Sequence, residues 1–458
     1  MIGLPSSSWL LLSILYLALP FSCCLPYSSV RWTRLNIARL GMALTTPSLG
    51  SPEHPMDGVI PTSQPQVIRN KIAHNVRVAS AACIVNGAFT ASAAASSLSS
   101  TSSTLDNGFK PFQVGEFLLN PIGFGCWSWG NEFLFSYDPK NDGELRRMYE
   151  FVRKQPNTWF DTAEVYGKDH RSENLLGEFG SSLKSEEKPL IFTKCAPQPQ
   201  RIGREVMYNA GRESAKRLGV DKLDMLQLHW PPSPALWQEE KYIQGMADLV
   251  KKKEATQMAV SNYGPEGIRR VTNIAKENGV NICTNQVQNS LLEQNLLQKG
   301  LVDVCKELGV QPMAYSPLAL GLLTDRYNED YLPRGARSIL FREYLPSMRP
   351  LLGVMREIAK NRNKSVSQVA INWNLCKGFL CLVGAHTVEQ CEENLGGASF
   401  RLTQAEVDEM DRKAALAKKF IANPQEGVSL MYCAANIIPT SHFALRTIVQ
   451  HRIEGSRS

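Results

Sequence analysis

Eight short apolar segments, separated by stretches of helical periodicity, dominate the chain between residues 109 and 420. They contain many β-branched and aromatic residues, which favours strands over helices. The predicted strands are Ile122–Trp127, Thr158–Thr162, Leu190–Lys194, Met225–His229, Gln257–Ser261, Cys283–Val287, Pro312–Ser316 and Leu380–Val383. The predicted helices between them include Gly203–Leu218, Gly267–Asn278 and Gln298–Leu308. Eight strands that alternate with helices predict a closed parallel (β/α)8 barrel, the TIM-barrel fold of the α/β class.

An open, doubly wound sheet is the main alternative architecture for such an alternation. That sheet usually has a G-x-G-x-x-G turn after its first strand, and no such turn opens a helix here. Before the first barrel strand, Phe112–Leu119 alternates around a Gly, which predicts a hairpin that closes the bottom of the barrel. The last gap between strands is longer than the others, and we expect it to hold a loop, Thr324–Met348.

The predicted strands end on polar residues. A buried Lys or Asp is energetically costly unless it is paired, so a ring of such residues at equivalent positions points to a function. The C-terminal ends of parallel barrel strands meet at one face, where the active sites of these barrels lie. We therefore predict an active site built from Asp161, Lys194, His229, Ser261, Asn262, Gln286 and Ser316.

These strand ends resemble the motifs of the aldo-keto reductase family, in the same order and at similar spacing. Each motif alone is weakly specific, but all of them in register are highly specific. The resemblance covers about residues 112 to 420. It rests on Phe160–Gly167, Ser172–Gly177, Phe192–Lys194, Asp224–Trp230, Val260–Tyr263, Asn285–Val287, Ala314–Leu318, Gly321–Leu323 and Gly384–His386, followed by Gln390, Glu393 and Asn394.

The resemblance implies a catalytic group of four residues, Asp161, Tyr166, Lys194 and His229. Reduction of a carbonyl needs a hydride on carbon and a proton on oxygen. Tyr166 would supply the proton, although a phenol with a pKa of ~10 is a reluctant acid or base at neutral pH. A nearby Lys194 would lower that pKa, Asp161 would hold the lysine, and His229 would orient the substrate carbonyl.

The resemblance also implies NADP(H) as the cofactor, which would supply the hydride. Position 386 usually carries Lys or Arg against the 2′-phosphate, but here it is His386, a weaker phosphate partner, so NAD(H) remains an alternative. Ser261, Asn262 and Gln286 would contact the nicotinamide carboxamide, and Tyr315 would stack on its ring. The expected cofactor residues are Ser261, Asn262, Gln286, Tyr315, Ser316, Pro317, Leu318, Gly321, Leu323, Gly384, His386, Gln390, Glu393 and Asn394.

The first 108 residues have the composition of targeting signals. Residues 1–24 contain no charged side chain and include the apolar run Trp9–Phe21, which is typical of a secretory signal. Residues 25–108 are rich in Ser, Thr, Ala and Pro, with basic residues exceeding acidic ones, which is typical of a transit peptide and predicts disorder. Together they predict delivery to a plastid through the secretory pathway, with simple secretion as the alternative.

The composition of the chain argues against nucleic-acid binding, membrane insertion and a metal site. The net charge of +7 is mild and not concentrated in one long block, so no nucleic-acid partner is expected. The apolar run near the N-terminus is too short for a comfortable membrane span, so we expect no stable membrane insertion of the mature protein. The eleven cysteines form no C-x-x-C pair, and no metal site is expected.

The oligomeric state is left open. The barrel is expected to occupy residues 109–423, with a tail of unassigned order at 424–458.

Three functions fit this pattern. The first is an NADP(H)-dependent reductase of aldehydes or ketones, whose substrate is a small-molecule carbonyl compound. The second is a cofactor-binding, redox-sensing regulatory subunit with little turnover. The third is a barrel enzyme of other chemistry, such as an isomerase, which would not need the expected carboxamide contacts. Four tryptophans indicate an aromatic pocket, although barrel packing explains some of them equally well: Trp127, Trp129, Trp230 and Trp237.

Overall fold

The computed structural model describes residues 108–419 except 199, 234 and 334–336. The predicted presequence segments and the tail at 424–458 therefore lie outside the described residues. The strands are β1 (Phe112–Val114), β2 (Phe117–Leu119), β3 (Ile122–Gly125), β4 (Trp159–Asp161), β5 (Leu190–Cys195), β6 (Leu223–Leu228), β7 (Ala255–Ser261), β8 (Ile282–Gln288), β9 (Gln311–Tyr315) and β10 (Leu380–Gly384).

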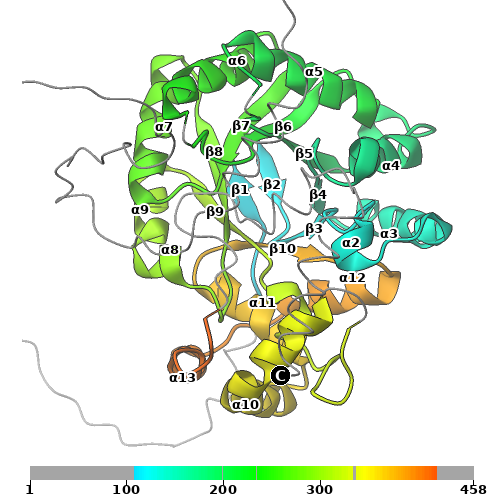
Figure 1. Cartoon of the computed structure of the whole chain (residues 1–458), viewed down its shortest axis with the longest axis vertical. Helices are drawn as coiled ribbons and strands as arrows, with labels where there is room; N and C mark the ends of the chain where they lie inside the picture. The colour runs from blue at the N-terminus through cyan, green and yellow to red at the C-terminus, as the bar shows by residue number, and fades with distance from the viewer. Residues whose placement is uncertain (1–107, 199, 234, 334–336, 420–458) are drawn as a thin grey trace, which may run out of the picture. The chain divides into compact units, whose positions relative to one another are not determined.

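Strands β3 to β10 form a closed barrel in which every strand is parallel to its neighbours, and β10 pairs with β3 to complete it (Figure 1). The barrel predicted from the sequence is therefore confirmed, with strand ends within about two residues of those expected. Helices surround the strands: α2 (Glu132–Phe135), α3 (Asp142–Arg153), α4 (Arg171–Phe179), α5 (Glu205–Leu218), α6 (Glu239–Lys251), α7 (Pro265–Glu277), α8 (Asn295–Gln298), α9 (Leu301–Leu308), α10 (Arg337–Arg362), α11 (Val366–Cys376), α12 (Val388–Leu395) and α13 (Gln404–Ala414).

The hairpin predicted before the first barrel strand is confirmed as the antiparallel pair β1–β2. It packs against the N-terminal ends of the barrel strands, where Val114 and Leu119 join the core cluster of Trp159 and Phe192. Gln257 of β7 ties the hairpin to the barrel, because its Nε2 donates to Val114 O at 3.3 Å. The hairpin thus closes the bottom of the barrel and leaves the C-terminal face for a site.

The segment predicted to be a loop, Thr324–Met348, is a loop only in its first part. Helix α10 begins at Arg337 and includes Pro346 and Pro350. Prolines are unfavourable inside a helix, but Phe341, Leu345 and Met348 recur at helical spacing and are buried. Burial of this apolar stripe outweighs the unfavourable prolines, so the loop prediction was wrong from residue 337 onward.

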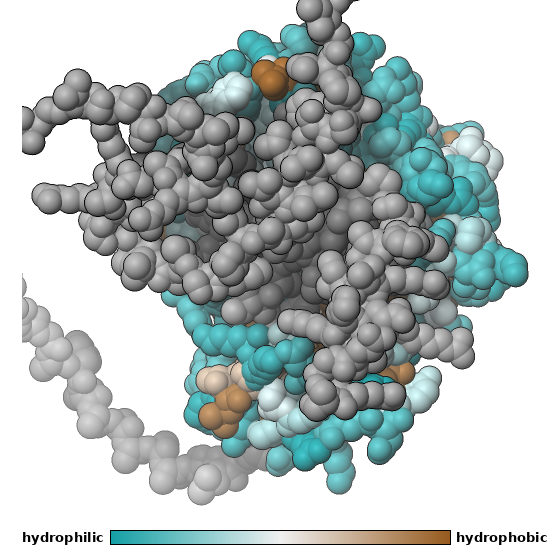
Figure 2. Space-filling model, viewed as in Figure 1, coloured by the Kyte–Doolittle hydropathy of each residue, from teal (hydrophilic) through white to brown (hydrophobic). Residues whose placement is uncertain are grey.

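The coloured surface visible in Figure 2 is mostly hydrophilic, with small separate hydrophobic patches. Within the described ranges, we find no helix long and apolar enough to cross a membrane.

Candidate active site

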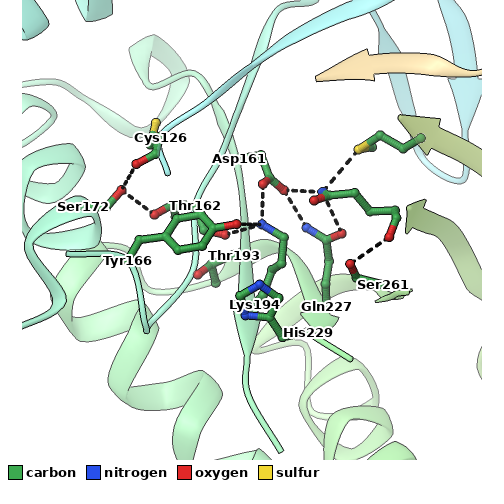
Figure 3. A network of polar contacts seen from close by, with 12 residues as sticks. Cys126, Asp161, Thr162, Tyr166, Ser172, Thr193, Lys194, Gln227, His229 and Ser261 are labelled. Carbon is green, nitrogen blue, oxygen red and sulfur yellow. Dashed lines mark hydrogen bonds and ion pairs between the residues drawn. The ribbon is translucent and has the colours of Figure 1, made fainter. Parts of the chain in front are cut away.

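The four predicted catalytic residues converge at the C-terminal face of the barrel (Figure 3). Asp161 ends β4, Lys194 lies in β5, His229 follows β6, and Tyr166 lies in the turn after β4. The ammonium of Lys194 donates to a carboxylate oxygen of Asp161, to the carbonyl of Thr162 at 2.8 Å and to the hydroxyl of Tyr166 at 3.2 Å. An ammonium has three donors, and all three are directed at acceptors within the site.

The electrostatic environment keeps Lys194 charged. Burial alone would lower the pKa of this fully buried lysine, but the carboxylate of Asp161 and the contact with Tyr166 outweigh burial and raise the pKa above its usual 10.5. Lys194 is therefore a cation at neutral pH, 3.2 Å from the Tyr166 hydroxyl. A cation at this distance favours the phenolate form of a tyrosine, which suits a tyrosine that gives up its proton.

His229 is suited to act as an uncharged hydrogen-bond donor. Its ring lies with its centroid 5.6 Å from the ring centroid of Tyr166, at an interplanar angle of 72°. Burial, and then the charge of Lys194, lower the pKa of His229 well below its usual 6.5. At neutral pH the imidazole is uncharged, so it can donate one hydrogen bond to a substrate oxygen without competing with Tyr166 as an acid.

The depressed pKa predicts a pH-dependent stability. Below pH 6.5 the unfolded chain binds a proton at His229 that the folded protein excludes, so stability falls as the pH falls. A His229→Gln variant should lose less stability between pH 7.5 and pH 5.5, by at most about 1.4 kcal/mol per pH unit. Thermal melts of both proteins at the two pH values test this. Equal losses would show that His229 binds its proton equally well in the folded and unfolded states, which would contradict the lowered pKa.

The second carboxylate oxygen of Asp161 is held by two glutamines. The Nε2 atoms of Gln227 and Gln286 each donate to Asp161 Oδ2 at 2.8 Å. Figure 3 shows the amide of Gln227 directed at Asp161. The predicted site contained Gln286 but not Gln227. A signal was present, because Gln227 stands two residues before His229, and alternate residues of a strand share a face.

The predicted carboxamide contacts lie beside the catalytic group. The Ser261 hydroxyl donates to the Gln286 carbonyl at 2.7 Å, and Asn262 Nδ2 donates to the His229 carbonyl at 3.0 Å. Asn262 adopts a left-handed backbone with φ of 67°. This conformation is uncommon for non-glycine residues and often marks functional sites. The Tyr315 hydroxyl donates to Asn262 Oδ1 at 2.9 Å, which fixes the ring that was expected to stack on nicotinamide.

A cleft of about 1070 Å³ runs from this centre to the start of α12. The predicted cofactor residues line it, with one exception: Leu323 is fully buried in a core cluster with Phe341 and Leu345 and does not line the cleft. Those that line it are Ser261, Asn262, Gln286, Tyr315, Ser316, Pro317, Leu318, Gly321, Gly384, His386, Gln390, Glu393 and Asn394.

Aromatic residues form the wall of the cleft beside Tyr166. Trp127 packs in a cluster with Tyr166 and Trp230, and its ring meets Phe135 edge-on at 5.2 Å between centroids. Of the four tryptophans considered for the pocket, Trp129 is instead fully buried in the main core, and Trp237 is 64% exposed. Of the four tryptophans only Trp127 lines the cleft, together with Phe135.

His386 lies where a phosphate-binding cation was expected. The residue is exposed to the cleft, but the surrounding protein displaces much of the water around its ring. This desolvation, and then the charges of Arg337 and Arg326, lower the pKa of His386 to about 4. The imidazole is therefore neutral at pH 7, which makes it a weak partner for a phosphate.

The two arginines were not predicted from the sequence. Both line the cleft. Arg337 packs over the Phe135 ring at 5.4 Å, and Arg326 over the Tyr327 ring at 5.5 Å. Within the described part of the chain neither guanidinium forms an ion pair with a carboxylate. They therefore place two positive charges close enough to His386 to lower its pKa.

The chain is similar to known proteins in sequence and in fold. The model of the aldo/keto reductase family matches residues 121–415. The chain belongs to the aldo/keto reductase family. This membership makes it an oxidoreductase by family, and it confirms the resemblance predicted from the sequence.

Among curated proteins, the chain is 39% identical over 309 residues to the chloroplastic pyridoxal reductase of Arabidopsis thaliana, with 65% of this chain and 85% of that protein covered. Among solved structures, the glycerol dehydrogenase of Gluconobacter oxydans has a TM-score of 0.58 at 22% identity, covering 69% of this chain and 97% of that one. An aldo/keto reductase of Klebsiella pneumoniae, solved with NADP and acetate, has a TM-score of 0.55 at 21% identity, covering 70% and 99%. These two structures share its fold.

Proposed function

We propose that this protein is an NADP(H)-dependent reductase that converts an aldehyde to an alcohol, with Tyr166 as the proton donor. The observation that carries the proposal is the buried contact of Lys194 with both Asp161 and Tyr166 at the edge of the cleft. A structural ion pair would not need a tyrosine hydroxyl on the same ammonium. The complete set of four residues favours catalysis over a purely regulatory role, and the expected carboxamide contacts favour a reductase over an isomerase.

Each residue has a defined task in the proposed reaction. Neutral His229 donates a hydrogen bond to the carbonyl oxygen and orients it. Tyr166 transfers its hydroxyl proton to that oxygen as negative charge develops there, and Lys194 stabilises the phenolate left behind. Asp161 keeps the lysine in place. When bound, the reduced nicotinamide supplies the hydride.

The residues of the cleft fit a phosphorylated dinucleotide. Gln286 and Asn262 are polar groups suited to a carboxamide, and Tyr315 offers an aromatic face. The cleft also extends past the guanidinium groups of Arg326 and Arg337. Planar guanidinium groups bind phosphates well. Arg326 and Arg337 can therefore replace the cation that His386 lacks, which favours NADP(H) over NAD(H). The K. pneumoniae relative solved with NADP agrees with this choice.

Removal of one guanidinium should weaken NADPH binding selectively. In an Arg337→Gln variant we expect the dissociation constant for NADPH to rise about tenfold or more, because a charge-assisted contact to phosphate is lost. The value for NADH should change little. A His386→Gln variant, which removes a neutral ring, is the matched control and should bind NADPH nearly as well as the wild type. Equal weakening of NADPH and NADH in Arg337→Gln would contradict the assignment.

We further propose that the substrate is an aromatic aldehyde of the pyridoxal type. The wall beside Tyr166 carries Trp127 and Phe135, whose faces suit a planar ring, and the plant relative at 39% identity is named for pyridoxal. NADPH oxidation by the purified chain with pyridoxal, 4-nitrobenzaldehyde and butanal tests this. Turnover of pyridoxal at the highest kcat/KM supports the proposal. Butanal as the best substrate would overturn the aromatic preference, and bound NADPH without turnover would favour a regulatory role.

We propose a plastid location, as the composition of residues 1–108 predicts and as the chloroplastic relative supports. The two-part route through the secretory pathway remains part of this proposal. A fluorescent protein fused after residue 108 should enter the plastid, and deletion of residues 1–24 should abolish that entry. Secretion of the fusion would favour the alternative.

A further inference from the structure

We infer that Gln227 is a positioning residue that holds the Gln286 amide in its orientation towards the nicotinamide carboxamide, by direct contact and by sharing Asp161 as a partner. The inference rests on the proposed function, because it concerns the same cofactor cleft. Gln227 is fully buried in the barrel interior on β6, and it does not line the cleft. Any effect on the cofactor must therefore pass through its neighbours.

The carboxylate of Asp161 determines which way both amides face. An ionised carboxylate only accepts hydrogen bonds, so the atom that each glutamine presents to Asp161 Oδ2 at 2.8 Å must be the amide nitrogen. The reversed amide would place oxygen against oxygen. The orientation of Gln227 and Gln286 thus follows from chemistry and from the two contact distances.

Gln227 completes the arrangement around Gln286. With its nitrogen on Asp161, Gln227 presents Oε1 to Gln286 Nε2, at 3.4 Å. Gln286 Nε2 is also 3.5 Å from Met313 Sδ. Both N–H groups of the Gln286 amide are therefore directed into the barrel, and the Ser261 hydroxyl holds its backbone carbonyl at 2.7 Å. This leaves Oε1 of Gln286 as the atom available to the cleft.

An acceptor at that position selects a donor on the ligand. The carboxamide of nicotinamide has an NH2 group, which can donate to Gln286 Oε1. A nicotinamide analogue in which the carboxamide is replaced by an acetyl group keeps the carbonyl but lacks this donor. If Gln227 is removed, the Gln286 amide can move into the vacated space beside Asp161, and Oε1 is no longer fixed against the carboxamide.

The test compares binding of NADP+ with binding of its 3-acetylpyridine analogue to the apoprotein, by quenching of tryptophan fluorescence. The wild type should bind NADP+ about fivefold more tightly than the analogue, which is the size of one net hydrogen bond. In Gln227→Met, a variant of similar volume, this ratio should fall below about twofold. Gln286→Met should lose the preference equally, and the double variant should lose no more than either single variant.

The control is Gln257→Met. Gln257 is also a buried glutamine inside the barrel, on the neighbouring strand β7, but it contacts the bottom hairpin. It should retain the wild-type ratio even if its melting temperature falls. An unchanged ratio in Gln227→Met, with both ligands weakened equally, would overturn the inference and leave a merely structural role. If the wild type binds neither dinucleotide, the proposed function itself fails, and the inference fails with it.

Discussion

A Tyr166→Phe variant is expected to lose the reductase activity by a factor of about 10² to 10⁴, while it still binds NADPH. The change removes only the hydroxyl that lies 3.2 Å from the Lys194 ammonium. Proton transfer by a positioned side chain contributes about this much to a rate. The ring, which packs with Trp127 and Trp230, is retained. Steady-state NADPH oxidation and NADPH titration of both proteins measure the two quantities.

The chain offers a matched control for this change. Tyr149 is a fully buried tyrosine of the main core, and among the described residues its hydroxyl has no hydrogen-bond partner. Tyr149→Phe therefore removes the same atom from a site where it does nothing for catalysis, and its activity should equal that of the wild type. Equal activity of Tyr166→Phe and wild type would exclude Tyr166 as the proton donor.

A Lys194→Met variant is expected to lose activity to a similar extent, and to lose stability as well. The lysine is the cation that favours the Tyr166 phenolate, so its removal leaves a phenol that gives up its proton reluctantly. It also leaves the fully buried carboxylate of Asp161 without its ion-pair partner. Breaking a buried pair in this way typically costs about 3–5 kcal/mol. Activity assays and denaturant unfolding of the variant measure both losses.

A double variant separates the two effects. The double variant Asp161→Asn, Lys194→Met has neither of the two charges, so no buried carboxylate is left without a partner. Much of the stability lost in Lys194→Met should therefore return. The activity should stay low, because the cation beside Tyr166 is still absent. Lys377→Met, which breaks the partly exposed pair with Asp411, should leave the rate unchanged, because neither residue lines the cleft. Recovery of activity together with stability would show that Lys194 acts only by holding the fold.

The prediction for the barrel succeeded because the relevant signals are local. Alternation of apolar runs with helical periods identifies the eight strands, and the polar residue at each strand end then falls on one face. Asp161, Lys194 and His229 could be predicted in this way, since strand ends of a parallel barrel meet whatever the details of packing. The length of α10 could not be predicted in this way, because prolines are unfavourable inside a helix. Burial of Phe341 and Leu345 nevertheless stabilises the helix.

Sequence alone therefore determined the architecture and the absence of a fixed cation at position 386, and it predicted the four candidate catalytic residues. Only the tertiary structure brought Gln227 and Gln286, 59 residues apart, onto the same oxygen of Asp161. It likewise placed Arg326 and Arg337 beside His386, and it buried Leu323 away from the cleft. The physical reason is that periodicity along a chain specifies which face a residue occupies. Distances between side chains on different elements depend on how those elements pack, and no local pattern encodes that packing.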